Sequence, residues 1–332
     1  MRRRPGWAVW MLLAVGCSHG AAPAASGRPE LREEWLTALQ SDVGQIAAND
    51  GFQGAVRVVR AGKVDIDDAF GDRTCLPLGS GRRLLSIVAV AALVDEGKLN
   101  FDDRVVRFLP QYERTSFDRL TVSHLLAASS GLAPTAGATP ADALAAAAKV
   151  PLGASPGTRI DTADERPWLL LEQVVAAASG RSLAEVLQER VLSPAGLAET
   201  SLGPTSTCPA AAGGTSSVGD LLRLGEALRS GKLVRPATRD ALWAGRIDLG
   251  PGLQRGLGFT LRGTETQQAV GFSAVGPVPA LELWINPGNG DMLALIGRTD
   301  TRSAQHLRTA LGEFFGLPPG LSQPAPARYR PH

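Results

Sequence analysis

The stretch that decides the fold is LGSGRRLLSIVAVAALVDEGKL, residues 78–99. Its positions 84–94 are apolar on nearly every face, which is typical of a helix enclosed on all sides by protein. The pattern predicts a helix from about Gly81 to Glu96 that ends at Gly97. A chain of 332 residues, of which 44% are hydrophobic, is long enough to bury such a helix in a large core.

Strand patterns flank this helix in the sequence, some before it and some far after it. Residues 52–59 and 63–69 are rich in valine and meet at Ala61-Gly62, which predicts a hairpin. Further strands are predicted at 257–261, 268–272, 281–285 and 292–296, the last two joined by the turn sequence of residues 286–290. The segments between are helical, with helices expected at 121–126, 140–149 and 167–179 and helix starts at Ser182 and Ser217. Strands at both ends of a helical middle predict a sheet built from sequence-distant segments and a second, all-helical lobe.

The N-terminus has the pattern of an exported protein. Arg2, Arg3 and Arg4 precede the apolar run 7–15, which is far shorter than the roughly 20 residues of a membrane-spanning helix. The run ends in Ala14-Val15-Gly16-Cys17, which resembles the lipobox of bacterial lipoproteins except that Ala14 replaces the usual leucine. We therefore expect a signal peptide at 1–17, a lipid on Cys17 and a flexible tether at 18–29. A plain signal peptide is the alternative.

This reading places the protein in the bacterial cell envelope, held by its lipid to the outer membrane and facing the periplasm. A helix is expected over 31–46 and another at 304–315, and the proline-rich residues 317–332 are predicted to be disordered. With Cys17 lipidated, Cys75 and Cys208 remain, and the sequence leaves open whether they form a disulfide or stay as two thiols.

Charge and motif spacing exclude several functions. The net charge is +2 and no basic stripe with interleaved aromatics is present, so nucleic acid is not an expected partner. No His, Asp or Glu grouping has metal-ligand spacing, and no glycine-rich phosphate loop follows a strand. We accordingly predict neither a metal nor a cofactor.

Several strings in the chain resemble serine beta-lactamases and the related penicillin-binding esterases and peptidases, in particular the class C beta-lactamase-related hydrolases. They occur in the family's order between about Phe52 and Arg298. The matching strings are Leu78–Arg83 with Leu93–Leu99, Leu109-Pro110 with Leu120–Leu126, Ser129–Leu132, Pro156–Arg159, Leu192–Leu197 and Ala212–Ser217. The resemblance implies an α+β fold over residues 30–316, with an antiparallel sheet flanked by helices and an all-helical lobe at about 100–250.

The resemblance also implies where a catalytic site lies. In the family a serine at the start of the buried helix is the nucleophile, and a lysine three residues later helps to remove its proton. A tyrosine with a nearby asparagine relays protons, and a Lys-Thr-Gly or His-x-Gly triplet on a strand closes the far wall. The matching positions here are Ser80 for the nucleophile, Arg83 for the lysine, Thr162 for the tyrosine, Asp164 for the asparagine, and Phe272 and Ala274 for the third motif.

These departures predict impaired catalysis. The Arg83 guanidinium stays protonated in proteins and cannot act as a base, whereas a general base contributes about 10²–10⁴-fold to rate. We therefore expect an envelope lipoprotein that is a pseudoenzyme, with a repurposed cleft that binds a cell-wall peptide or a small acyl compound. One alternative is an active esterase, D-peptidase or beta-lactamase in which Asp161 or Asp164 activates Ser80. Another is a structural lipoprotein without a ligand.

Each site residue also has a purely structural interpretation. Ser80 is a residue type that caps helices well, and its hydroxyl would then accept from a backbone N–H of the first turn. Arg83 would pair with Asp161 or Asp164 in a salt bridge. His124 lies in a string that matches the family's helix wording rather than its site, and we expect it to be structural.

Overall fold

The structure is a computed structural model in which all of the described strands belong to one antiparallel sheet. It describes residues 51–298 apart from 72–74, 138, 212, 265–266 and 276–279, together with residues 37, 40–41 and 43–49. The sheet has eight strands in the order β2-β1-β8-β7-β6-β5-β4-β3. Their bounds are β1 Gln53–Arg60, β2 Lys63–Phe70, β3 Ile247–Gly250, β4 Leu253–Arg255, β5 Thr260–Thr264, β6 Gln267–Val275, β7 Ala280–Ile285 and β8 Met292–Arg298.

The sheet confirms that strands from both ends of the chain lie side by side. Strand β1 pairs with β2 on one side and with β8 on the other, with Val56 opposite Leu295. The hairpin turn falls at Ala61 and Gly62, both with positive φ. The sequence did not predict β3 and β4, because both are short and lack a clear alternation of apolar and polar residues.

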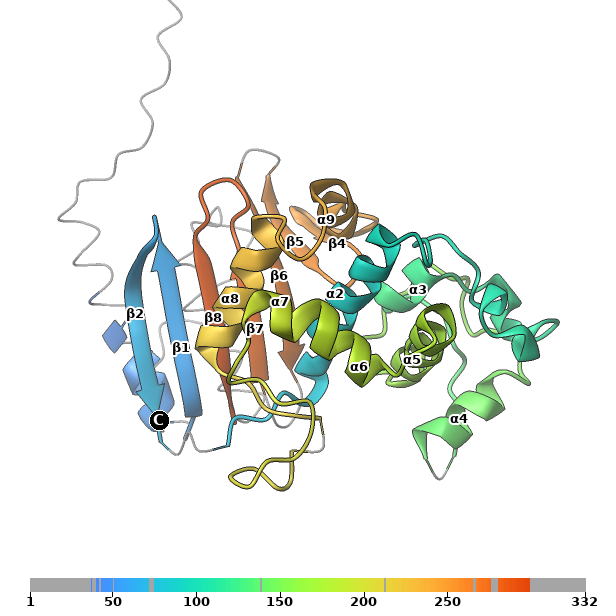
Figure 1. Cartoon of the computed structure of the whole chain (residues 1–332), viewed down its shortest axis with the longest axis horizontal. Helices are drawn as coiled ribbons and strands as arrows, with labels where there is room; N and C mark the ends of the chain where they lie inside the picture. The colour runs from blue at the N-terminus through green and yellow to red at the C-terminus, as the bar shows by residue number, and fades with distance from the viewer. Residues whose placement is uncertain are drawn as a thin grey trace, which may run out of the picture.

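The helix expected near residues 81–96 is present as α2, Arg82–Asp95, and the 3-10 turn η1, Gly79–Gly81, leads into it. Residues 84–93 are all buried, as their unbroken apolar pattern predicts. The approach to the sheet is close: a Cβ on Gly81 would lie 2.6 Å from the side chain of Leu281 in β7. Helix α2 lies between the sheet and the helical lobe (Figure 1).

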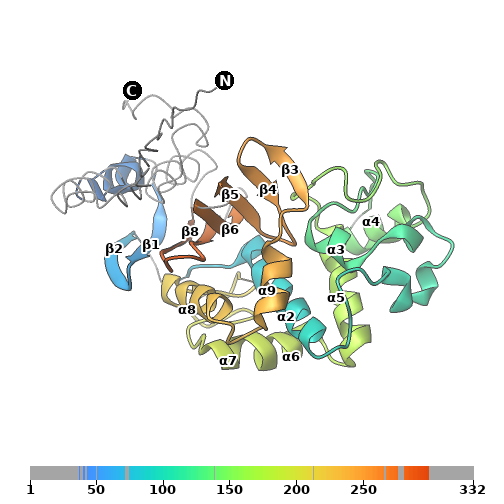
Figure 2. The same cartoon turned by 90° about the horizontal axis from the view of Figure 1, so that it is seen from above.

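The other helices divide between the lobe and the face of the sheet (Figures 1 and 2). Their bounds are α3 Val122–Leu126, α4 Pro140–Ala147, α5 Arg166–Ser179, α6 Leu183–Leu187, α7 Ser193–Ala195, α8 Val218–Arg229 and α9 Pro236–Trp243; short turns are η2 Val105–Arg107, η3 Pro110–Tyr112, η4 Ser116–Arg119 and the π-helical η5 Gln188–Leu192. Helix α8 packs on β1, β7 and β8. The lobe therefore does not extend to residue 250 as expected, since α8 covers the sheet. The helix starts predicted at Ser182 and Ser217 are confirmed, because both side chains accept a backbone N–H of the first turn.

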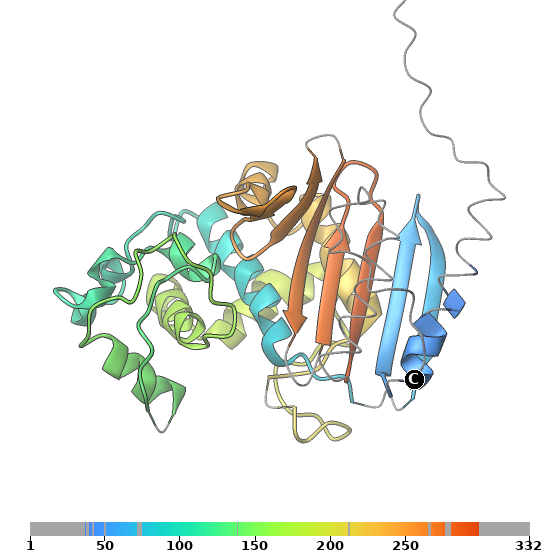
Figure 3. The ribbon, with the colours of Figure 1, turned by 180° about the vertical axis from the view of Figure 1, so that it is seen from behind.

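The two faces of the sheet carry separate cores. The larger core joins α2, the other helices and one face of the sheet. The smaller core lies on the opposite face, where Val43 and Ile46 pack with Phe52 and Trp284; Figure 3 views the molecule from this side. Residues 43–49 are helical, which agrees with the helix expected there.

The predicted signal peptide, Cys17, the tether, the helix at 304–315 and the tail at 317–332 lie outside the described residues. Within the described part of the chain, no helix has the length and apolar character needed to cross a membrane. In that same part, no three His, Cys, Asp or Glu side chains are grouped as a metal site would require.

Cys75 and Cys208 are joined by a disulfide in the structure, with their Cα atoms 4.9 Å apart. The bond ties the segment before η1 to the loop before α8, across 133 residues of sequence. The same two segments are held by a hydrogen bond from the Leu78 N–H to the Gly214 carbonyl, 2.8 Å. Both links fix the chain just ahead of Ser80.

Candidate functional site

Ser80 lies in the middle of η1, directly before the buried helix α2, and its side chain is partly exposed. The N-cap positions of η1 and α2 are Leu78 and Gly81, and neither helix start has a side-chain capping bond. The interpretation of Ser80 as a helix cap is therefore wrong. The hydroxyl makes no hydrogen bond to any residue that the structure describes.

The guanidinium of Arg83, at the lysine position, is held on three sides. Its Nη1 donates to the Thr162 carbonyl at 2.5 Å, its Nη2 pairs with the Glu165 carboxylate, and its Cζ lies 5.2 Å from the centre of the Trp168 ring. The side chain is only 11% exposed, and its Nε is enclosed without a hydrogen-bond partner. The predicted salt bridge to Asp161 or Asp164 is wrong, because the turn of this loop presents Glu165 to Arg83 instead.

Asp164, at the asparagine position, is committed to Arg166. The two form a bidentate pair at 2.7 and 2.8 Å, and Arg166 also donates to the Ala133 carbonyl. The hydrogen bonds to the Asp164 carboxylate, and next its charge, raise the pKa of Arg166 against the opposing effect of burial. Asp161 likewise bonds within its own loop, since its Oδ1 accepts hydrogen bonds from the N–H groups of residues 163 and 164. Neither carboxylate is directed to Ser80 by these contacts.

Thr162, at the tyrosine position, is not oriented as a proton relay would be. Its backbone carbonyl faces Arg83, whereas its side chain is exposed and its hydroxyl bonds to no described residue. A relay group must lie within hydrogen-bond reach of the proton that it moves. Thr162 therefore contributes a fixed carbonyl dipole to this region.

The third-motif positions lie on the last part of β6, which has an open edge. Strand β5 pairs with β6 only as far as Gly271, opposite Thr260, so residues 272–275 have no described strand on that side. Phe272 and Ala274 are 4% and 6% exposed and belong to the larger core. Both side chains thus pack into the core beneath the sheet. Neither supplies the polar group that the family has at the third-motif position.

Arg255, which the sequence did not single out, is a second buried cation near Arg83. It ends β4, lies opposite Thr260 in the sheet and is 7% exposed. Its Nη1 donates to the Thr260 hydroxyl at 3.2 Å, and its Nε is enclosed without a partner. Burial and, next, the charge of Arg83 lower the pKa of Arg255 to about 10.

The residues missed by the sequence reasoning are Glu165, Trp168 and Arg255. Glu165 and Trp168 lie within six residues after Thr162, so their closeness to this motif position is the signal that could have identified them. Arg255 has no comparable signal, because its burial depends on the pairing of a strand of three residues.

His124 is structural, as expected from its place in the sequence. It completes a capping box at the start of α3: its backbone N–H donates to the Thr121 hydroxyl, and its Nδ1 accepts from the Thr121 N–H at 3.2 Å. Burial lowers the pKa of His124, and the charge of Asp102 partly opposes that shift. The ring thus stabilises a helix start as a neutral acceptor.

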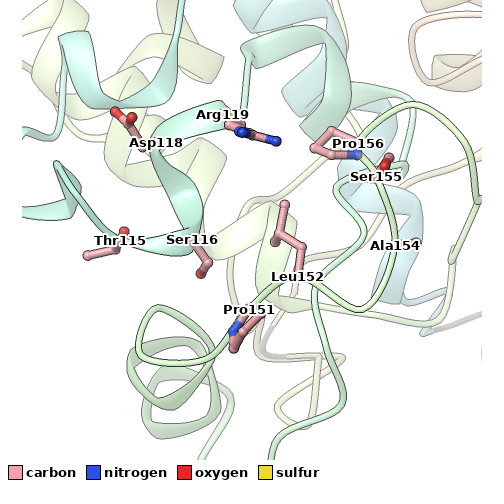
Figure 4. A pocket seen from close by; sticks show the side chains of 9 residues that line it. All are labelled: Thr115, Ser116, Asp118, Arg119, Pro151, Leu152, Ala154, Ser155 and Pro156. Carbon is pink, nitrogen blue, oxygen red and sulfur yellow. The ribbon is translucent and has the colours of Figure 1, made fainter.

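The helical lobe also holds a cavity of about 440 Å³ that none of the candidate site residues lines. Figure 4 shows its lining, which comes from two segments: Thr115, Ser116, Asp118 and Arg119 on one side and Pro151, Leu152, Ala154, Ser155 and Pro156 on the other. Asp118 is paired with Arg104. Arg119 is exposed and has no hydrogen bond or ion pair with another described residue.

Comparison with known proteins assigns the chain to a family. The beta-lactamase family model matches residues 39–311. No curated protein matches the chain. Among solved structures, the chain is similar to a penicillin-binding protein from Bacillus halodurans (TM-score 0.69, 17% identity, covering 82% of this chain and 99% of that one) and to an octameric penicillin-binding protein homologue from Pyrococcus abyssi (TM-score 0.71, 20% identity, covering 87% and 79%).

A D-stereospecific amidohydrolase from Streptomyces is also similar (TM-score 0.66, 18% identity, covering 81% of this chain and 97% of that one). These identities are low, so the likenesses speak to the fold, whereas the family model spans most of the chain. The resemblance and the α+β fold inferred from the sequence are both confirmed. The chain therefore belongs to the beta-lactamase family of serine hydrolases.

Proposed function

We propose that the protein is a non-hydrolytic member of this family, a pseudoenzyme whose Ser80 region binds a cell-wall peptide or a small acyl compound. The observation that carries the proposal is the state of Arg83. A guanidinium stays protonated, and this one is also immobilised by the Thr162 carbonyl and the Glu165 carboxylate. Arg83 therefore cannot accept the proton of the Ser80 hydroxyl. The carboxylates of Asp161 and Asp164 do not replace it as the base, because both are bonded within their own loop.

The other two motif positions support the same proposal. Asp164 is bonded to Arg166, and the side chains of Phe272 and Ala274 are buried in the core. Groups that act as a unit in catalysis lose their effect together rather than additively. Without the base, the relay and a polar third motif, the Ser80 region retains a serine, the Thr162 carbonyl dipole and the positive charge of Arg83.

One observation favours the second candidate, an active serine hydrolase of esterase, D-peptidase or beta-lactamase type with a non-standard base. Ser80 caps neither η1 nor α2, so helix stability does not account for a serine at this position. Ser80 is partly exposed and its hydroxyl is unbonded within the described chain, as a nucleophile's would be before it meets substrate.

Covalent labelling separates the two candidates. The purified protein is incubated with a fluorescent penicillin or a fluorophosphonate, beside the Ser80→Ala variant and an active hydrolase of the family. We expect the active hydrolase to be labelled and the wild type to show no more label than Ser80→Ala. Label on the wild type that disappears in Ser80→Ala would establish the active enzyme instead.

Restoring the motifs gives a second test that the structure makes sharper. Arg83→Lys with Thr162→Tyr and Phe272→His rebuilds the family's site on paper, but a histidine at 272 replaces a core side chain that is 4% exposed. Burying an imidazole without a partner costs about 1–3 kcal/mol. The variant Arg83→Lys with Thr162→Tyr alone avoids that cost. Esterase activity that rises only in the triple variant supports the motif assignment, and activity in neither variant argues against it.

We also propose that the protein is lipid-anchored in the cell envelope through Cys17, on the strength of the Ala14-Val15-Gly16-Cys17 string alone. Radiolabelled palmitate fed to expressing bacteria should enter the wild type, which should fractionate with the outer membrane. Cys17→Ser should lose the label and accumulate uncleaved. Unlabelled wild type in the soluble periplasmic fraction would instead indicate a plain signal peptide.

A further inference from the structure

The cavity of the helical lobe presents one positive charge that no described residue neutralises. Two charged residues line it, Asp118 and Arg119, both from the turn η4. The Asp118 carboxylate pairs with Arg104 at 2.8 Å, and the Arg104 Nε also donates to the Asp118 carbonyl at 2.8 Å. Arg119 makes no hydrogen bond or ion pair with a described residue. The charge available to a ligand in the cavity is therefore that of Arg119.

The side chains of these two neighbours point in different directions (Figure 4). Arg119 extends toward Ser155 and Pro156 on the opposite segment, whereas Asp118 points away from that segment. Leu152 extends into the space between the two segments, and its side chain also packs against the larger core. The cavity therefore combines a cation on one side with an apolar surface on the other.

The hydroxyl groups at the cavity differ in whether their protons are available. Thr115 donates its proton to the Tyr112 carbonyl at 2.6 Å. Ser116 donates its proton to the Ala147 carbonyl at 2.9 Å. The Ser155 hydroxyl bonds to no described residue. Of the three, Ser155 is therefore the one that can donate to a bound oxyanion.

The wall formed by residues 151–156 is held in place by its backbone. The N–H groups of Gly153 and Ala154 both donate to the Gly131 carbonyl, at 2.9 and 3.2 Å. The two segments are so close that a Cβ on Gly131 would lie 2.3 Å from the Ala154 carbonyl oxygen. A wall fixed in this way exists before a ligand arrives, so the cost of ordering it does not oppose binding.

We propose that this cavity is a second binding site, and that it takes a small molecule with a carboxylate head and an apolar body. The volume of about 440 Å³ lies at the lower end of the range of small-molecule pockets. The fork of the Arg119 guanidinium matches the two oxygens of a carboxylate. Its single charge suits a monoanion better than a phosphate dianion, because the Asp118 carboxylate borders the same cavity. None of the candidate residues around Ser80 lines this site.

Thermal unfolding of the full chain tests the site with hexanoate, hexanamide and acetate. Hexanamide keeps the apolar chain without the charge, and acetate keeps the charge without the chain. Sodium chloride holds the ionic strength constant, and each probe is titrated to about 50 mM, so that a Kd on the order of millimolar is detected. At about tenfold excess over Kd, hexanoate should raise the Tm by roughly 3–5 °C, and the other two probes should raise it less. No rise with hexanoate, or an equal rise with either other probe, would overturn the proposal.

Three variants assign the binding to the cavity. Arg119→Gln should abolish the rise with hexanoate and leave the Tm without probe unchanged, because Arg119 is exposed and unpaired within the described chain. Ala154→Met, which places a longer side chain at the cavity and keeps Arg119, should reduce the rise. Arg159→Gln is the matched control and should respond as the wild type does. Arg159 is exposed, has no partner among the described residues and does not line the cavity.

A rise that is unchanged in Arg119→Gln or in Ala154→Met, or that Arg159→Gln also removes, would refute the assignment to this cavity. The result is separate from the test of the proposed function. Covalent labelling reports on Ser80, and the response of these variants to hexanoate reports on the cavity. Either proposal can therefore fail while the other stands.

Discussion

Arg83→Lys tests whether the arginine at the lysine position has become a structural residue. The wild-type side chain uses separate nitrogens for the Thr162 carbonyl and for Glu165 and lies 5.2 Å from the Trp168 ring centre. A lysine ammonium reaches one of the two acceptors and loses the flat contact with the ring. A hydrogen bond to a charged group contributes about 1.5–3 kcal/mol and a cation–π contact about 0.5–1 kcal/mol. Since Glu165 is more than half exposed, we take the low end and expect a loss of about 2 kcal/mol.

The assay is unfolding in guanidinium chloride, followed by tryptophan fluorescence and circular dichroism, with thermal scans in parallel. For a domain of this size the loss corresponds to a Tm lower by roughly 4–8 °C. Arg82→Lys is the matched control, because Arg82 is adjacent on the same helix and makes no side-chain hydrogen bond or ion pair with a described residue. That variant should stay within about 0.5 kcal/mol of the wild type. An Arg83→Lys variant as stable as Arg82→Lys would refute the locked-arginine argument.

Two further predictions concern stability. Replacing Cys75 and Cys208 together with serine frees a loop of 133 residues, so the free energy of unfolding measured in guanidinium chloride should fall by about 2–5 kcal/mol; a fall below about 1 kcal/mol would contradict this expectation. Burial lowers the pKa of His124, so the unfolded chain binds the proton more readily. The stability contributed by neutral His124 is therefore complete above a pH of about 6.5 and is lost as the pH falls through the folded pKa. His124→Gln should show a flatter decline of Tm between neutral and acidic pH, and an unchanged decline would contradict this.

The fold could be inferred from the sequence because its signals are local. The apolar residues 84–94 define a buried helix without knowledge of what surrounds it, and Asn286-Pro287-Gly288 defines a turn. The strands β3 and β4 could not, since three or four residues carry too little periodicity and their pairing is set by neighbours in space. Arg255 was missed for the same reason.

The site shows a different limit. Motif order located Ser80 and Arg83, but the partner of Arg83 is 82 residues away in a loop that holds three acidic side chains within five positions. Which of Asp161, Asp164 and Glu165 faces α2 depends on the turn between them. In this turn Asp161 accepts hydrogen bonds from the N–H groups of residues 163 and 164, and Asp164 accepts hydrogen bonds from Arg166. Glu165 forms the ion pair with Arg83. Which of these acidic residues pairs with Arg83 is decided by the backbone conformation of the loop, and residue types alone do not specify that conformation.

The pairing of β1 with both β2 and β8 has a consequence for biosynthesis. The N-terminal hairpin is made first, yet Val56 meets Leu295 only after nearly the whole domain has been synthesised. Until then one edge of β1 has no partner, and contacts between such distant segments form slowly. A ribosome that stops before Met292 would release a chain with open edges on both β1 and β7, prone to pair with other copies. Among the described strands, the last to be made, β8, is therefore the one that protects the first, β1, from aggregation.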